Sequence, residues 1–343
     1  MAQSARPGAD RLRRAWEKRR GLALALLPVS WLYGALVKMR QLLYCSGVLP
    51  RYRAPVPVVV VGNVVAGGAG KTPVTIAILE HLQSVGWSPG VVSRGYGRAS
   101  SGLKCSHHHT LDAAIFGDEP ALIAQRCQVP VAVAEKRSDA AAALLVQHPQ
   151  VNILVSDDGL QHLAMQRDIE ICVFNSAGVG NGWLLPAGPL REPWPRPVEL
   201  VVFDGTAPPP SPAPAFRMHR RLAEHAVTAQ GEAIALACLA RQDASVEPTE
   251  LWAVAGTARP EEFFAMLRNA GVPLAGTTAL PDHYNFDSWE RTVDKRYRLI
   301  FTEKDAVKLW PFFPDALAVR LELDVEPGFF AALDTLLAQK QKL

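Results

Sequence analysis

The stretch that most constrains the fold is residues 58–74, VVVVGNVVAGGAGKTPV. The β-branched run of residues 56–64 predicts a parallel strand that is buried on both faces. Residues 73–86 then predict a helix that ends at Gly86. The glycine-rich turn between them ends in Gly-Lys-Thr, so its glycines lie at a helix N-terminus. Free backbone N–H groups and the helix dipole favour a phosphate at that place.

This turn departs at one position from the usual Gly-x-x-x-x-Gly-Lys-Ser/Thr pattern, because Val65 stands where the first glycine is expected. The first glycine is dispensable if Val65 keeps a negative φ and the later glycines form the turn. We therefore interpret the stretch as a nucleotide-binding loop rather than a structural glycine turn. Lys71 is expected to reach the terminal phosphates and Thr72 to bind Mg²⁺, while Pro73 suits a first helical turn. The predicted nucleotide-binding residues are Gly67, Gly68, Ala69, Gly70, Lys71, Thr72 and Pro73.

A Mg²⁺ site of this type needs a carboxylate at the end of a neighbouring strand. The hydrophobic run of residues 151–156 ends in Asp157 and Asp158, as the strand before a Walker B aspartate does. Two acids in an ordinary turn are the alternative interpretation. The nearby phosphate loop favours Asp157 as a magnesium ligand.

Strands and helices alternate along the chain, which predicts a doubly wound, mostly parallel α/β sheet of the P-loop NTPase type. A proline-rich linker and a second, smaller α/β domain are expected after it. This domain would close over the active site, and its last helix could instead pack on the first domain. The predicted divisions are an N-terminal helix (1–48), the P-loop domain (49–206), the linker (207–216) and the second domain (217–343).

Charge is unevenly distributed along the 343 residues, although the net charge is only +3. Residues 1–53 hold eleven Lys or Arg and two Asp or Glu, whereas the remainder holds 25 basic and 31 acidic residues. A basic arm on an acidic body indicates an anionic partner, either a nucleic acid or a phospholipid surface. Five cysteines without paired spacing indicate a reducing compartment and no zinc site. The run of residues 105–109, CSHHH, has no further ligand pattern around it, so we do not predict a metal there.

The basic arm continues into a hydrophobic stretch, residues 21–37, which has no charged residue before Lys38. Leu32, Leu36, Met39 and Leu43 recur at helical spacing, which favours a helix lying in the membrane interface. Basic residues beside it would meet anionic headgroups. A membrane-spanning helix, a signal peptide and a helix packed on the protein itself are the alternatives.

Seven short motifs follow one another along the chain. They are GNVVAGGAGKTP (62–73), SRGYGR (93–98), GDEP (117–120), DDGLQH (157–162), PAGPLRE (186–192), PDHYNF (281–286) and FTEKDAVK (301–308). Together they resemble the tetraacyldisaccharide 4'-kinase (lipid A 4'-kinase) family of Gram-negative bacteria, from the hydrophobic helix to about residue 308. In that family the first glycine of the loop is not part of the pattern. The resemblance implies transfer of the γ-phosphate of ATP, with Mg²⁺, to the 4'-hydroxyl of a tetraacylated glucosamine disaccharide 1-phosphate. The product is lipid IVA, formed by a peripheral protein at the cytoplasmic face of the inner membrane.

The resemblance also implies roles for individual residues. Asp118 would be the general base and His283 its partner, beside the catalytic Lys71. Asp118 taken alone would be interpreted as a helix N-cap. Glu192 would join Thr72 and Asp157 at the magnesium site. The implied substrate-binding residues are Arg94, Tyr96, Arg98, Arg137, Asp158, Gln161 and His162.

Three other functions compete with this one. A P-loop GTPase or ATPase switch is one, but residues 302–305, TEKD, have the wrong spacing for a guanine-binding motif. A nucleic-acid-dependent ATPase should interleave basic and aromatic residues, whereas the core of the arm is rich in Leu and Ala. We therefore expect no nucleic-acid partner. A soluble small-molecule kinase would have no use for residues 21–43.

Overall fold

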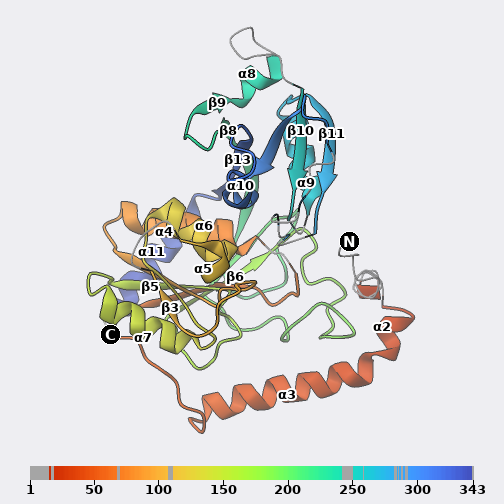
Figure 1. The fold of residues 1–343 in the computed structure, drawn as a ribbon. Coiled ribbons are helices and arrows are strands. Elements are labelled where there is room, and N and C mark those ends of the chain that lie inside the picture. Colours follow the sequence, from red (N-terminus) through yellow and green to blue (C-terminus); the bar gives the residue numbers. More distant parts are fainter. Residues whose placement is uncertain are drawn as a thin grey trace. The chain divides into compact units, whose positions relative to one another are not determined.

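The computed structural model describes residues 15–16, 19–67, 70–106, 111–241, 250–257, 259–281, 284, 286, 289 and 293–341. The chain forms two compact units (Figure 1). Unit 1 comprises Met1–His219 with Val325–Leu343, and unit 2 comprises Arg220–Asp324. The boundary lies within a strand that begins at Ala215, so the last residues of the predicted linker are part of a sheet.

A mostly parallel sheet forms the centre of unit 1, which confirms the predicted α/β class. Its order is β8-β7-β6-β1-β5-β2-β4-β3, and β3 at one edge is antiparallel to its neighbour. Every residue of β1, β2, β5 and β6 is buried, as expected of strands covered on both faces. The strands are β1 (Val58–Gly62), β2 (Pro89–Ser93), β3 (Lys104–Cys105), β4 (Val131–Val133), β5 (Ile153–Asp157), β6 (Ile169–Phe174), β7 (Leu200–Phe203) and β8 (Ala215–Val227).

Helices on both sides of this sheet complete unit 1. They are α4 (Lys71–Ser84), α5 (Ala113–Phe116), α6 (Asp118–Cys127), α7 (Arg137–Gln147) and α11 (Gly328–Gln341). The C-terminal helix α11 packs on α4, where the His81 ring stacks on Phe330 at 4.4 Å and its Nε2 lies 2.9 Å from Asp334. The last helix of the chain is therefore part of unit 1 rather than of the unit that precedes it in sequence.

Two N-terminal helices, α2 (Leu22–Ala25) and α3 (Leu27–Cys45), precede the sheet of unit 1, and α3 contacts the segment of residues 181–192. The Ser30 hydroxyl donates to Leu184 O at 2.8 Å, and the Tyr33 hydroxyl donates to Arg191 O at 2.8 Å. A Cβ at Gly34 would lie 2.8 Å from the Leu184 side chain, so a glycine lets the helix approach closely. No helix in the described part of the chain is long and apolar enough to cross a membrane.

Unit 2 is a smaller α/β unit. Its parallel sheet has the order β11-β10-β12-β13, and β9 pairs with the end of β8. Phe263 and Phe264 of α9 pack with Ile300 of β12 in its core. The elements are β9 (Ala233–Ala235), α8 (Leu236–Arg241), β10 (Leu251–Ala255), α9 (Pro260–Asn269), β11 (Leu274–Ala279), β12 (Arg298–Thr302), α10 (Glu303–Leu309) and β13 (Leu317–Val325).

Candidate active site

The phosphate loop connects β1 to α4 at the centre of the unit 1 sheet. Gly67 has φ +116° and Gly70, the N-cap of α4, has φ +78°, values that favour glycine. No side chain of the described residues caps this helix, so its first N–H groups can bind a ligand. Val65 does not have a positive φ, so a non-glycine residue can stand at the position of the usual first glycine. Gly68 and Ala69 lie outside the described residues.

Lys71, the first residue of α4, faces the end of strand β5. Its Nζ lies 3.5 Å from Asp158 Oδ1, and Arg191 Nη1 lies 3.6 Å from the same oxygen. Asp158 adopts φ +50°, which turns the chain sharply after the strand. Burial raises the pKa of Asp158, but Lys71, Arg191 and Arg137 together hold it below its ordinary value. Asp158 is therefore a carboxylate shared by two cations beside the phosphate loop.

Asp157, the last residue of β5, is 1% exposed. Its Oδ1 accepts a hydrogen bond from Thr75 of α4 at 3.0 Å, whereas Oδ2 has no partner among the described residues. Burial, with Glu119 and Asp158 nearby, raises its pKa to about 7. A buried carboxylate oxygen without a partner beside a phosphate loop fits a hard cation such as Mg²⁺.

Glu119 is the residue that sequence reasoning missed. It follows Asp118 in the GDEP motif, and its charge is the largest electrostatic contribution to the raised pKa of Asp157. No group of three or more His, Cys, Asp or Glu suited to a metal occurs in the described chain. A Mg²⁺ held by one or two carboxylates and by phosphates needs no such group.

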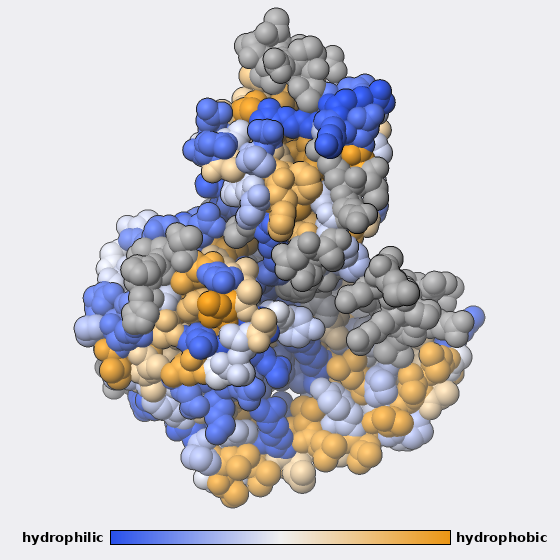
Figure 2. Space-filling model, viewed as in Figure 1, coloured by the Kyte–Doolittle hydropathy of each residue, from blue (hydrophilic) through white to orange (hydrophobic). Residues whose placement is uncertain are grey.

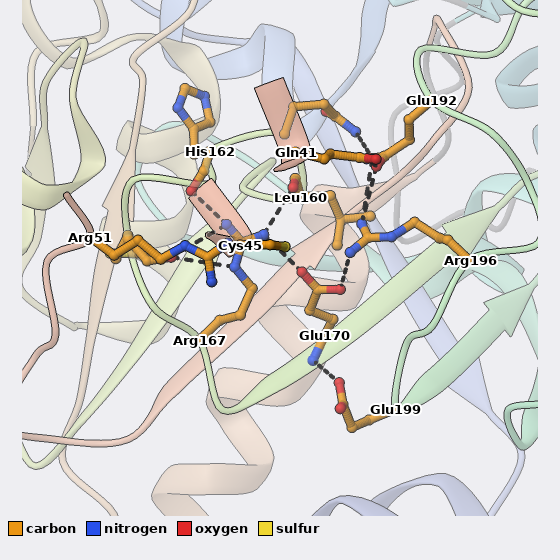
Figure 3. Close-up of polar contacts among 12 residues, drawn as sticks. Gln41, Cys45, Arg51, Leu160, His162, Arg167, Glu170, Glu192, Arg196 and Glu199 are labelled. Carbon is orange, nitrogen blue, oxygen red and sulfur yellow. Dashed lines mark hydrogen bonds and ion pairs between the residues drawn. The ribbon is translucent and has the colours of Figure 1, made fainter. Parts of the chain in front are cut away.

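Glu192 lies in a buried polar network (Figure 3). It is 3% exposed, accepts a hydrogen bond from Gln161 Nε2 at 2.6 Å and pairs with Arg196 at 3.4 Å. Arg196 also contacts Glu170, which pairs with Arg167 at 2.7 Å. Gln161 Nε2 also donates to Asn63 O at 3.0 Å, directly after β1. The structure thus brings Glu192 and Gln161 together at the base of the phosphate loop, while its role as a magnesium ligand stays a prediction.

A group of cations surrounds Asp158. Arg137 is 3% exposed and donates to Asp158 O at 3.4 Å, but its Nε and Nη1 have no partner among the described residues. Burial lowers the pKa of Arg137 to about 10. Burial, Arg137 and Arg94 lower the pKa of His162 to about 4, so this imidazole is neutral at pH 7. Unpaired buried guanidinium donors indicate a site for an anion.

The comparison with known sequences decides which family this site belongs to. The family model described as "LpxK: Tetraacyldisaccharide-1-P 4'-kinase" matches residues 22–338. The chain belongs to this family. The resemblance seen in the motifs is confirmed, and the protein is a kinase of the tetraacyldisaccharide-1-P 4'-kinase family.

Individual relatives match over almost their whole length. Two proteins called tetraacyldisaccharide 4'-kinase, from Acidovorax sp. (strain JS42) and Delftia acidovorans, are 57% and 54% identical to the chain. The first alignment covers 98% of both chains, and the second covers 96% of this chain and 95% of the relative. The crystal structure of an "apo" form of LpxK from Aquifex aeolicus in complex with ATP is 26% identical, with a TM-score of 0.79. That likeness covers 92% of this chain and all of the other.

The remaining residues implied by the kinase family lie at the start of α6, on the loop after β2 or outside the described part. Asp118 begins α6, but Gly117 is its N-cap, so the N-cap interpretation of Asp118 is wrong by one residue. Arg94 and Tyr96 are exposed on the loop after β2. Arg98 donates to Gly102 O at 2.7 Å, which folds this loop on itself. His283 lies outside the described residues, as do His107, His108 and His109.

Proposed function

We propose that the protein is a tetraacyldisaccharide 4'-kinase. It transfers the γ-phosphate of ATP to the 4'-hydroxyl of a tetraacylated glucosamine disaccharide 1-phosphate, forming lipid IVA. The observation that carries this proposal is the end of β5 beside the phosphate loop, where Lys71 pairs with Asp158 and the buried Asp157 Oδ2 has no partner among the described residues. Family membership over residues 22–338 supplies the acceptor.

The nucleotide is held by the N-terminus of α4 and by Lys71. The N–H groups at the start of α4 and the ammonium of Lys71 offset the negative charge of the phosphates, the main requirement of phosphoryl transfer. Asp157 and Thr72 would hold Mg²⁺, with Glu192 as the further acid that the family implies. When bound, Mg²⁺ neutralises charge on the transferring group. Asp157 must lose its proton to do so, and Lys71 lowers its pKa towards that state.

The acceptor would be bound by Arg137 and the other substrate-binding residues that the family implies, and activated by Asp118. Arg137 offers two unpartnered buried donors, which suits the 1-phosphate of the glycolipid. Arg94, Tyr96, Arg98, Gln161 and His162 are the further substrate contacts that we propose from the family. Asp118, with His283 as its partner, would take the proton of the 4'-hydroxyl late in the transfer.

Helix α3 would place this site at a membrane surface. Trp31, Leu32, Leu36 and Met39 are 69%, 63%, 52% and 53% exposed, so an apolar face of the helix remains uncovered (Figure 2). The opposite face contacts residues 184–191, as described above. An exposed apolar face flanked by basic side chains is typical of a helix that lies in the headgroup region. We therefore propose a peripheral protein at the cytoplasmic face of the inner membrane, with anionic phospholipid as its partner.

Lipid-dependent ATP consumption tests the proposal. A kinase should consume ATP slowly with Mg²⁺ alone and much faster when the disaccharide 1-phosphate is added in mixed micelles. The nucleotide turned over should equal the phosphorylated lipid. ATP consumption that continues undiminished without any lipid would overturn the proposal in favour of an ATPase switch.

A further inference from the structure

Arg191 lies in the PLRE motif directly before Glu192, and neither the phosphate loop nor the implied substrate site assigns it a role. Its backbone is fixed from two sides. The N–H of Arg191 donates to Val64 O at 2.7 Å, and its carbonyl accepts from the Tyr33 hydroxyl of α3 at 2.8 Å. The neighbouring Leu190 forms a β-bridge with Val65. Arg191 is therefore held against the phosphate loop itself.

The side chains of Arg191 and Lys71 lie near the same oxygen atom, Oδ1 of Asp158. Lys71 Nζ lies 3.5 Å and Arg191 Nη1 3.6 Å from Asp158 Oδ1. Both separations exceed the usual 2.7–3.2 Å of a hydrogen bond, so neither cation is locked on the carboxylate. When Lys71 points at a phosphate, Asp158 loses one of the two cations that lie within 4 Å of its Oδ1, and Arg191 is the one that stays on that oxygen. An uncompensated carboxylate in a largely buried site costs free energy.

We propose that Arg191 is a positioning residue for Lys71, which keeps the Asp158 carboxylate paired when Lys71 turns to the nucleotide phosphates. This inference rests on the proposed function, because it needs a nucleotide at the phosphate loop. Arg191 acts here through Asp158 and not by touching the phosphates. This proposal predicts that Arg191 contributes to nucleotide affinity only while Asp158 carries its charge.

A double-mutant cycle on MgATP binding tests this prediction in the full-length protein, with equilibrium affinity rather than activity as the readout. Arg191→Gln should weaken MgATP binding about tenfold, the size of a coupling between contacting charges. In the Asp158→Asn background the same Arg191→Gln change should alter affinity less than about twofold, since no charge then needs a partner. Arg191→Lys, which keeps the positive charge, should retain most of the affinity. Arg53→Gln, at an exposed position of unit 1, is the matched control and should change nothing.

Two results would overturn the inference. A full loss of affinity on Arg191→Gln in the Asp158→Asn background would mean that Arg191 contacts the nucleotide directly or only supports the fold. Unchanged affinity in the single variant would mean that Asp158 needs no second cation. Failure of the proposed function is distinguishable, because then the wild-type protein would not bind MgATP or Lys71→Ala would bind it equally well.

Discussion

Two regions of unit 1 depart from the usual arrangement of a globular protein in opposite ways. Near the end of β5, ionisable groups are removed from water: Asp157 and Arg137 are 1% and 3% exposed, and each keeps polar atoms without a partner among the described residues. On the outer face of α3, large apolar side chains such as Trp31 and Leu32 remain in water at 69% and 63% exposure. Both arrangements cost free energy in the isolated protein. The difference fits our proposal that phosphates and a cation complete the first region and a lipid surface the second.

One segment of the chain, residues 181–192, connects the two regions. On one side it joins the phosphate loop through the Val65–Leu190 bridge and the Ala66 N–H to Pro189 O bond of 2.7 Å. On the other side it accepts hydrogen bonds from the Ser30 and Tyr33 hydroxyls of α3. The exposed face of α3, for which we propose a lipid contact, and the phosphate loop are therefore connected through one segment.

The largest effect is expected at Lys71. Lys71→Ala should lower phosphoryl transfer at least about 10³-fold, because a fixed charge on the transferring group is lost. Its far-ultraviolet circular dichroism should match that of the wild type, since Lys71 lies at a helix start and its side chain forms an ion pair with Asp158 rather than packing in the core. Membrane retention should be unchanged. An active Lys71→Ala protein would show that this loop does not hold the phosphates in the way proposed.

Asp118 and His283 should give the next largest effect. Asp118→Asn and His283→Ala are each expected to lower turnover at least about 10²-fold, as the loss of a general base does. The double variant should add little beyond the worse single variant, since residues that act as a unit are not additive. MgATP affinity should stay nearly unchanged in all three. Defects that multiply fully would show that the two residues act independently.

The raised pKa of Asp157 predicts a pH dependence of metal binding. The charged form binds the cation, so Mg²⁺ affinity should rise with pH up to about 7, by up to about tenfold for each unit below that value. Without metal the sign for stability is opposite. The folded pKa exceeds the ordinary 3.8, so the free energy of unfolding falls as pH rises between these two values.

Titration of Mg²⁺ affinity and urea unfolding at pH 5, 6 and 7 measures both trends. Asp157→Asn should flatten them, whereas Glu80→Gln, an exposed carboxylate of α4, should leave them as in the wild type. Equal slopes in Asp157→Asn and wild type would show that another group titrates there.

The smallest effect is expected on α3, where each side chain adds a modest apolar area. Leu32→Ala should weaken partitioning into anionic vesicles about fivefold, with no change in MgATP affinity. Added salt should release part of the protein, since each headgroup-facing Lys or Arg contributes about 1 kcal/mol at low ionic strength. Val146→Ala is the matched control, because Val146 is 84% exposed on α7. If Leu32→Ala and Val146→Ala weaken vesicle partitioning equally, the exposed face of α3 has no special role in membrane binding.

Much of the first region could be predicted from sequence, because its signals are local. A buried β-branched strand, a glycine turn and a helix start identify the phosphate loop, and the strand end identifies Asp157 and Asp158. The shared pairing of Asp158 with Lys71 and Arg191 could not be predicted, since it joins residues far apart in sequence. The effect of Glu119 on Asp157 could not be predicted either, because an acid in the first turn of a helix such as α6 is common. On α3 the apolar spacing predicted the exposed face, but not the contacts of Ser30 and Tyr33 with residues 184–191.

The most direct test of the whole account is mass spectrometry of the lipid after incubation of the purified protein with Mg²⁺, ATP and tetraacylated disaccharide 1-phosphate. We expect the lipid to gain the mass of one phosphate, which fragmentation places on the 4' oxygen, and the Lys71→Ala protein to produce no such species. ATP consumed without a gain in lipid mass, or a phosphate on another oxygen of the disaccharide, would contradict the account.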